Sequence, residues 1–402
     1  MQNIEAKDGG ALVAGGGRNL DALKEEVQRR ANLDMPPLTG IGAEDAQTAL
    51  SQIRSLDREE WAAAWFAVGN RRWERARALD ARNLAEVRDE YWRAWRLFHF
   101  ARWPTENSPT RERAKHRALQ AFQAYARLLD PPMEVVRIPF EGKQIVGYLR
   151  LPLKLRPAPL VFAIAGLDSR KEDFAAHSDN YIKQGMALFA IDLPGTGESP
   201  LTTATPDAHR VFSEALDYLE KRPEVDSRRI VVQGRSWSGY WAAKLAVTER
   251  TRLRGSVMHG GPIHHYFQPD WLKASLSTGE YLYDYLAAKC ALVGAANLDE
   301  MVDRMRPFSL LDSGVLDQPS APMLCVNGAR DSQIPIADIY LLLEHGDAKE
   351  AWINPAGGHM GRSPEWPSSA IAQKVVMPWV ARRLGLAQAG AGGAPAADTS
   401  GL

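Results

Sequence analysis

A serine, an acid and a histidine occur along this sequence in the order and the local settings that nucleophilic catalysis needs. Ser236 lies in a Gly-Arg-Ser-Trp-Ser segment, Asp331 follows Asn-Gly-Ala-Arg, and His359 comes directly after two glycines. A serine hydroxyl is a weak nucleophile until a base takes its proton, and that base works best when a carboxylate orients it. These residue types therefore predict acyl transfer by a catalytic triad of Ser236, Asp331 and His359.

The surroundings of Ser236 predict the sharp turn that exposes such a nucleophile. An apolar run at 229–232 predicts a buried strand, and 240–247 predicts a helix. The pattern between them is Gly-x-Ser-x-Ser, with serine where glycine usually closes the motif. Small residues must flank the strained nucleophile, and Gly234 and Ser238 satisfy that demand. Strand, turn and helix together indicate a nucleophile elbow.

The predicted acid and base follow later strands. The apolar run 323–327 leads to Asp331, and a short strand at 351–353 leads to the glycine-rich loop of His359. Serine, then acid, then histidine is the chain order that accompanies this elbow. Other candidates fit less well, because they precede the acid or its strand, lie on helix surfaces, or point away from the base. These competitors are His209, His259, His264, His265, His345, Asp312, Asp317 and Ser238.

Acyl transfer also needs N–H donors for the developing oxyanion, each typically worth about 3 kcal/mol. The backbone N–H of Trp237, directly after the nucleophile, is one candidate. The second donor is expected in the loop after the apolar strand 160–165, which reads Gly-Leu-Asp-Ser. We expect it to be the backbone N–H of Leu167.

The elements that position these residues alternate between strands and helices. Residues 134–150 read as a β-hairpin, and further apolar strands are separated by helical segments. This order predicts an α/β fold with a mostly parallel, doubly wound sheet, in which ligands bind at the carboxyl ends of the strands. Residues 265–311 interrupt the alternation with helical, aromatic-rich sequence, which we interpret as a lid over the site.

The first third of the chain has helical periodicity instead. We predict a flexible glycine-rich tail at 1–18, an all-helical domain at 19–132 and a catalytic domain at 133–386. Aromatic residues recur on one face of the predicted helices, and helix–helix core packing explains them more simply than a ligand site does. Residues 387–402 are rich in Ala, Gly and Pro, and we expect them to be disordered.

The composition limits the classes of partner and cofactor that the sequence predicts. The 402 residues include 49 basic and 49 acidic side chains, so nothing predicts binding to nucleic acid or to an anionic membrane. The only cysteines, Cys290 and Cys325, are too few for a disulfide framework. Neither metal-ligand spacing nor a nucleotide-binding motif occurs, so we expect no cofactor. Without a long apolar run or a signal segment, we expect a soluble cytoplasmic protein that acts on a small molecule.

The Asp192-x-Pro-Gly-x-Gly-x-Ser motif, the elbow, Asp331 and His359 resemble the α/β-hydrolase superfamily over residues 133–386. The helical first domain, the Gly-Leu-Asp-Ser loop and the lid are similar to the group that contains 2,6-dihydroxypseudooxynicotine hydrolase and fermentation–respiration switch esterase-like proteins. This resemblance implies cleavage of C–C bonds in ketones and a homodimer that uses the helical domain. In the nicotine-pathway enzyme of that group, an extra carboxylate near the lid is associated with substrate binding. The resemblance therefore implies substrate contacts in this region, where this sequence offers His264, His265 and Tyr266.

Three functions remain open from the sequence. The first is hydrolysis of a C–C bond next to a carbonyl in a small cyclic or aromatic ketone. The second is a carboxylesterase or amidase with the same triad. The third is a non-catalytic ligand-binding protein, against which the intact triad argues.

Overall fold

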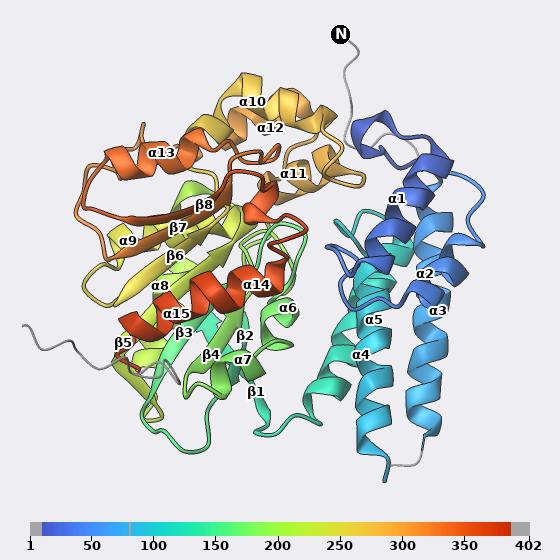
Figure 1. Cartoon of the computed structure of the whole chain (residues 1–402), viewed down its shortest axis with the longest axis horizontal. Helices are drawn as coiled ribbons and strands as arrows, with labels where there is room; N and C mark the ends of the chain where they lie inside the picture. The colour runs from blue at the N-terminus through green and yellow to red at the C-terminus, as the bar shows by residue number, and fades with distance from the viewer. Residues whose placement is uncertain (1–9, 80–81, 387–402) are drawn as a thin grey trace, which may run out of the picture.

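The computed structural model describes residues 10–79 and 82–386, which form a sheet-containing unit with a layer of helices beside it (Figure 1). The predictions for residues 1–9 and 387–402 lie outside the described residues. Within the described part of the chain, no helix is both long and apolar enough to cross a lipid bilayer.

One eight-stranded sheet, in the order β1-β2-β4-β3-β5-β6-β7-β8, organises the larger unit. The first hairpin, β1 with β2, is antiparallel, and β2 pairs antiparallel with β4, whereas the neighbours from β4 to β8 run parallel. This topology confirms the predicted α/β-hydrolase fold. The strands are β1 Met133–Phe140, β2 Lys143–Arg150, β3 Ala158–Ile164, β4 Ala187–Ile191, β5 Val225–Arg235, β6 Gly255–His259, β7 Met323–Gly328 and β8 Glu350–Asn354.

Helices cover both faces of the sheet because its central strands are apolar on both sides. Alternate residues of β3 enter different cores: Leu160 and Phe162 pack with the α8–α9 side, whereas Val161 packs with the α15 side. This double burial is typical of parallel strands. The covering helices are α6 Lys171–Ala175, α7 Asp179–Ile182, α8 Arg210–Glu220, α9 Gly239–Thr248, α13 Ala337–Glu344, α14 Ser368–Ile371 and α15 Met377–Arg383.

The segment that interrupts the alternation lies between β6 and β7. It contains α10 Pro269–Ala274, α11 Tyr285–Val293 and α12 Leu298–Met305. Figure 1 shows these helices gathered at one end of the sheet, with α11 on the side of the helical layer.

Within the described residues, five α-helices precede the sheet, and side-chain caps mark the start of three of them, at Asn19, Asp57 and Asn83. The Asn19 side chain accepts a hydrogen bond from Ala22 N at 2.9 Å, and Asp57 accepts one from Glu60 N at 2.8 Å. The helices are α1 Leu20–Asn32, α2 Ala43–Leu50, α3 Arg58–Ala78, α4 Leu84–Ala101 and α5 Pro109–Ala126.

The aromatic stripes of these helices are core residues. Trp95 of α4 and Phe122 of α5 have ring centroids 5.2 Å apart, and Phe122 lies 5.1 Å from Tyr148 of β2. Trp61 and Trp65 are likewise buried. The helical layer and the sheet therefore share one continuous apolar contact.

Residues 10–18 do not form the predicted free tail. Leu12 is buried, and its N–H donates to Leu56 O at 2.7 Å. Gly15 N donates to Leu282 O at 2.8 Å, so this segment lies against the chain that leads into α11. Its glycines suggested mobility, but backbone pairing with two distant segments holds it in place.

Candidate active site

Ser236 lies at the turn between β5 and α9, with the strained backbone that an elbow requires. Its φ is 53°, in the left-handed region that non-glycine residues rarely adopt. A Cβ on Gly234 would lie 1.9 Å from the Ser238 carbonyl oxygen, so only glycine fits there. The Ser238 hydroxyl donates to Ala165 O at the end of β3. Ser238 is therefore a buried link between neighbouring strand ends, with its hydroxyl bonded to the Ala165 carbonyl.

A continuous hydrogen-bonded chain joins the serine to the predicted base and the predicted acid. Ser236 Oγ lies 2.8 Å from His359 Nε2, and His359 Nδ1 lies 2.8 Å from Asp331 Oδ2. His359 and Asp331 are buried, whereas Ser236 is half-buried. The structure thus brings together three residues from three different strand-end loops.

Neighbouring N–H groups fix the Asp331 carboxylate. Oδ1 accepts hydrogen bonds from Gln333 N at 2.8 Å and Ile334 N at 3.0 Å, and Oδ2 accepts one from Asn327 Nδ2 at 2.9 Å. The Asn327 side-chain oxygen Oδ1 in turn accepts a hydrogen bond from Met360 N at 2.8 Å, next to the histidine. Asn327 therefore ties the loop of the acid to the loop of the base. In the sequence, this role of Asn327 was indicated only by its position, as a polar residue at the end of the apolar strand β7.

The loop after β3 lies directly against the elbow. A Cβ on Gly166 would be 3.1 Å from Ser236 Cβ and 2.9 Å from Arg235 O, so this approach depends on glycine. Leu167 follows within the same buried loop, and Trp237 is buried at the start of the turn. Their backbone N–H groups remain the predicted oxyanion donors.

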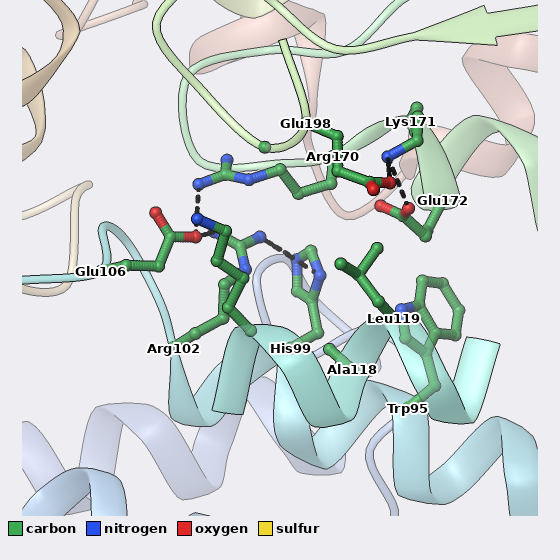
Figure 2. A pocket seen from close by; sticks show the side chains of 12 residues that line it. Trp95, His99, Arg102, Glu106, Ala118, Leu119, Arg170, Lys171, Glu172 and Glu198 are labelled. Atoms are coloured by element: carbon green, nitrogen blue, oxygen red, sulfur yellow. Dashed lines mark hydrogen bonds and ion pairs between the residues drawn. The ribbon is translucent and has the colours of Figure 1, made fainter. Parts of the chain in front are cut away.

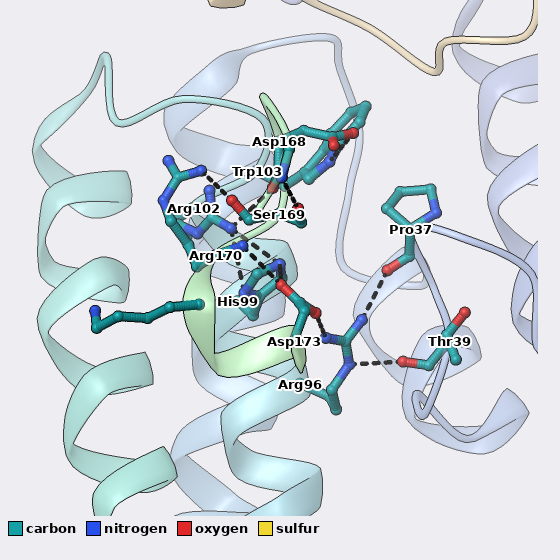
Figure 3. Close-up of polar contacts among 12 residues, drawn as sticks. Pro37, Thr39, Arg96, His99, Arg102, Trp103, Asp168, Ser169, Arg170 and Asp173 are labelled. Atoms are coloured by element: carbon teal, nitrogen blue, oxygen red, sulfur yellow. Dashed lines mark hydrogen bonds and ion pairs between the residues drawn. The ribbon is translucent and has the colours of Figure 1, made fainter. Parts of the chain in front are cut away.

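Side chains from the end of α4 hold that loop from behind (Figure 3). Arg102 Nη2 donates to Asp168 O at 2.9 Å, and Trp103 Nε1 donates to Asp168 Oδ2 at 3.0 Å. From within the loop, Arg170 Nη1 donates to Leu167 O at 3.2 Å. Beside them, burial and the Arg102 charge hold the pKa of His99 well below its usual value. The helical layer thus contributes hydrogen bonds to a loop of the site.

A small pocket that opens to solvent lies between α4, α5 and this loop (Figure 2). One of its walls is a buried charge cluster in which Lys171 Nζ lies 2.9 Å from Asp192 Oδ2 and 2.7 Å from Glu198 Oε2. The Asp192-x-Pro-Gly motif is thus part of this cluster. The cluster also requires glycine at position 197, because a Cβ there would lie 2.3 Å from Asp192 Oδ2. The residues of the serine–histidine–acid chain do not line the pocket.

The predicted substrate contacts occupy a turn after β6. Ile263, His264, His265 and Tyr266 all donate backbone N–H groups to the buried Asp338 carboxylate, at 2.7 to 3.3 Å. The imidazole of His264 lies 2.7 Å from Ser309 Oγ, and His265 is exposed. Within residues 10–79 and 82–386, no hydrogen bond joins either histidine to the triad residues. The role of these three side chains toward substrate stays a prediction.

Comparison with known proteins places the chain in a family. A model described as Esterase FrsA-like matches residues 47–355. A relative named Esterase FrsA from Vibrio parahaemolyticus is 24% identical over 308 residues, which cover 75% of this chain and 73% of the relative. Another of that name, from Vibrio cholerae, is 28% identical over 309 residues, with the same coverage.

Solved structures share the fold. 2,6-dihydroxy-pseudo-oxynicotine hydrolase superposes with a TM-score of 0.71 at 20% identity, over 86% of this chain and 93% of its own. AbyA5 superposes with a TM-score of 0.71 at 21% identity, over 92% of this chain and 96% of its own. The chain is an α/β hydrolase, and because the family model spans well over half of its length, it belongs to the Esterase FrsA-like family.

Proposed function

We propose that the protein is a serine hydrolase in which Ser236 attacks an acyl carbonyl. His359 takes the serine proton as general base and returns it to the leaving group, while Asp331 orients the imidazole and stabilises its charged form. The observation that carries this proposal is the continuous chain from Ser236 Oγ to Asp331 Oδ2, with both links at 2.8 Å.

The oxyanion that forms in this reaction needs donors fixed in advance. We propose the backbone N–H groups of Leu167 and Trp237. The close approach of Gly166 to Ser236 supports this assignment, because it brings the loop of Leu167 beside the nucleophile. Preorganisation is supported by the hydrogen bonds from Arg102, Trp103 and Arg170 to that loop.

A carboxylic ester is the substrate class that we favour. Relatives that cover three quarters of the chain are named esterases. An ester also makes the least demand on the site, because an alkoxide leaving group needs only the proton that His359 carries.

Cleavage of a C–C bond next to a carbonyl in a small cyclic or aromatic ketone is the second candidate. Its leaving group is a carbanion, which must take up a proton. Tyr266 supports this candidate: its hydroxyl is buried and makes no hydrogen bond of normal geometry within the described chain, although Tyr285 and the Trp237 indole lie close by. Lys289 Nζ lies 5.1 Å from the Tyr266 ring centroid, and burial lowers the pKa of that lysine to about 7.

Two substrate series decide between these reactions. Initial rates would be measured with p-nitrophenyl esters and with cyclic and aromatic β-diketones, for the wild type and Tyr266→Phe. Ester turnover without diketone turnover supports the esterase. Diketone turnover that falls in Tyr266→Phe, while any ester turnover is kept, supports the C–C hydrolase. Binding of either series without turnover, and without reaction with a fluorophosphonate, would point to a non-catalytic ligand-binding protein.

A further inference from the structure

A carboxylate from the insertion reaches both the loop of the base and the loop of the acid. Glu280 lies in residues 278–284, the segment before α11, which we call the strap. Its Oε1 accepts the backbone N–H of His359 at 2.8 Å, and its Oε2 accepts the Ser332 hydroxyl at 2.7 Å. Ser332 directly follows Asp331, so one side chain bridges the two loops.

The loop of the base is shaped to admit this carboxylate. A Cβ on Gly358 would lie 3.0 Å from Glu280 Oε1, closer than a side chain normally approaches. Arg362 provides a nearby positive charge, and its Nε donates to the His359 carbonyl at 2.9 Å. Burial lowers the pKa of Arg362, and the Glu280 and Asp331 carboxylates offset part of that effect. The negative charge of Glu280 is therefore balanced where it meets the loop.

The helical region and the segment before it hold the strap from the other side. Arg30 of α1 donates through Nη2 to the Glu280 carbonyl at 2.8 Å, and Arg18 Nη2 donates to Gly279 O at 2.7 Å. At the far end of the strap, the buried Asp284 accepts hydrogen bonds from Arg111 Nη1 at 2.9 Å and Arg58 Nε at 3.2 Å. Four arginines thus hold the strap, two through its backbone carbonyls and two through the Asp284 side chain, while the Glu280 side chain reaches the site.

We propose that Glu280 is a positioning residue. Its carboxylate fixes the loop of His359, and Arg30 of the helical region in turn fixes the backbone of Glu280. This inference rests on the proposed function, because it assigns His359 as the base. A hydrogen bond to the backbone of the base fixes where the imidazole stands relative to Ser236 and Asp331. Small displacements of a catalytic group reduce the rate strongly, by roughly a hundredfold for about 1 Å.

The test uses two probes on the full chain: p-nitrophenyl butyrate turnover and the second-order rate of inactivation by a fluorophosphonate. Glu280→Ala is expected to lower kcat and the inactivation rate by about ten- to a hundredfold, with KM within about twofold. Glu280→Gln retains an oxygen that can accept the His359 N–H, and it is expected to recover most of that loss. A role limited to lid stability would move the thermal midpoint of both variants without this recovery.

Asp270 supplies the matched control, because it is an exposed acid of the same insertion, in the first turn of α10. Asp270→Ala is expected to leave both rates unchanged. Arg30→Met is expected to reduce both rates about threefold to tenfold in the wild-type background and in Glu280→Gln, which keeps the contact to His359, but little further in Glu280→Ala, because interactions in one chain of contacts are not additive. Arg30→Met alone carries the test if Glu280→Ala does not fold.

Wild-type rates for Glu280→Ala, or for Arg30→Met where Glu280→Ala does not fold, would overturn the inference. So would a Glu280→Gln variant as slow as Glu280→Ala. Failure of the underlying function looks different, because the wild-type protein itself would then neither hydrolyse the ester nor react with the fluorophosphonate.

Discussion

The sheet and the helical layer contribute to the site in different ways. Strand-end loops of the sheet supply Ser236, Asp331 and His359, which are hydrogen-bonded directly to one another. The helical layer supplies none of these groups. Its side chains instead bind the backbone of two segments beside them, as in Arg102 to Asp168 O and Arg30 to Glu280 O. Under the proposed function, the reacting atoms come from the sheet, and the helical layer contributes part of their placement.

Removing a member of the hydrogen-bonded chain should have the largest effect. Ser236→Ala, His359→Ala and Asp331→Asn are each expected to lower kcat on p-nitrophenyl butyrate by about 10⁴-fold or more. Combined variants should be little worse than single ones, because the residues act as one unit. Circular dichroism should show an unchanged fold for Ser236→Ala. If that variant keeps more than about a hundredth of the wild-type rate, the nucleophile is another residue.

Removing the helical layer tests the other half of the comparison. A chain that begins at Met133 loses the cover of Tyr148 and the arginines that bind the two site segments. It is expected to aggregate, or to be soluble with ester turnover reduced at least about a hundredfold. Sedimentation and turnover measure the two outcomes. A soluble, monomeric and fully active chain would make the helical layer an accessory.

A single hydrogen bond from the helical layer should have a smaller effect. Trp103→Phe removes the bond from Nε1 to Asp168 Oδ2 but keeps an aromatic ring against Tyr281, whose centroid lies 4.8 Å from that of Trp103. We expect kcat to fall roughly five- to tenfold, with little change in thermal stability. Trp379→Phe is the control, because it removes the bond from Nε1 to Glu350 on β8, on the α15 side of the sheet. If Trp103→Phe and Trp379→Phe have equal rates, the hydrogen bond from the helical layer to the loop after β3 does not contribute to turnover.

The smallest effect concerns stability at low pH. Burial raises the pKa of Glu106, but the Arg170 and Arg102 charges outweigh it and hold that pKa at about 2, against 4.5 for the ordinary group. A lowered folded-state pKa contributes stability that is present above pH 4.5 and is lost as pH falls toward 2. Urea unfolding of Glu106→Gln should therefore show a deficit of at most about 3 kcal/mol at pH 6 that shrinks at pH 3. If the loss of unfolding free energy in Glu106→Gln does not change with pH, the charge of the Glu106 carboxylate is not what stabilises its contacts with Arg102 and Arg170.

The sequence predicted the sheet and the grouping of Ser236, Asp331 and His359 because both depend on local pattern. Apolar runs bounded by glycine and polar residues marked the strands, and Ser236, Asp331 and His359 each followed one of them. The helical caps at Asn19 and Asp57 are equally local signals.

The supporting contacts could not be predicted in the same way. Glu280 and Asp338 act on backbone N–H groups of segments that lie far away in the sequence. Nothing near either residue distinguishes it from a surface acid until the fold brings the segments together. The glycines of residues 10–18 suggested mobility for the same reason, since the partners Leu56 and Leu282 are remote.

Reaction with a fluorophosphonate, followed by peptide mass spectrometry, is the most direct test that Ser236 is the nucleophile. We expect one adduct in the wild-type chain, on the peptide that contains Ser236, and none in Ser236→Ala. We also expect the adduct to form more slowly in Glu280→Ala and Trp103→Phe, the variants that loosen the two supported segments. An adduct on another residue, or ester hydrolysis that continues after Ser236 is fully modified, would show that Ser236 is not the nucleophile.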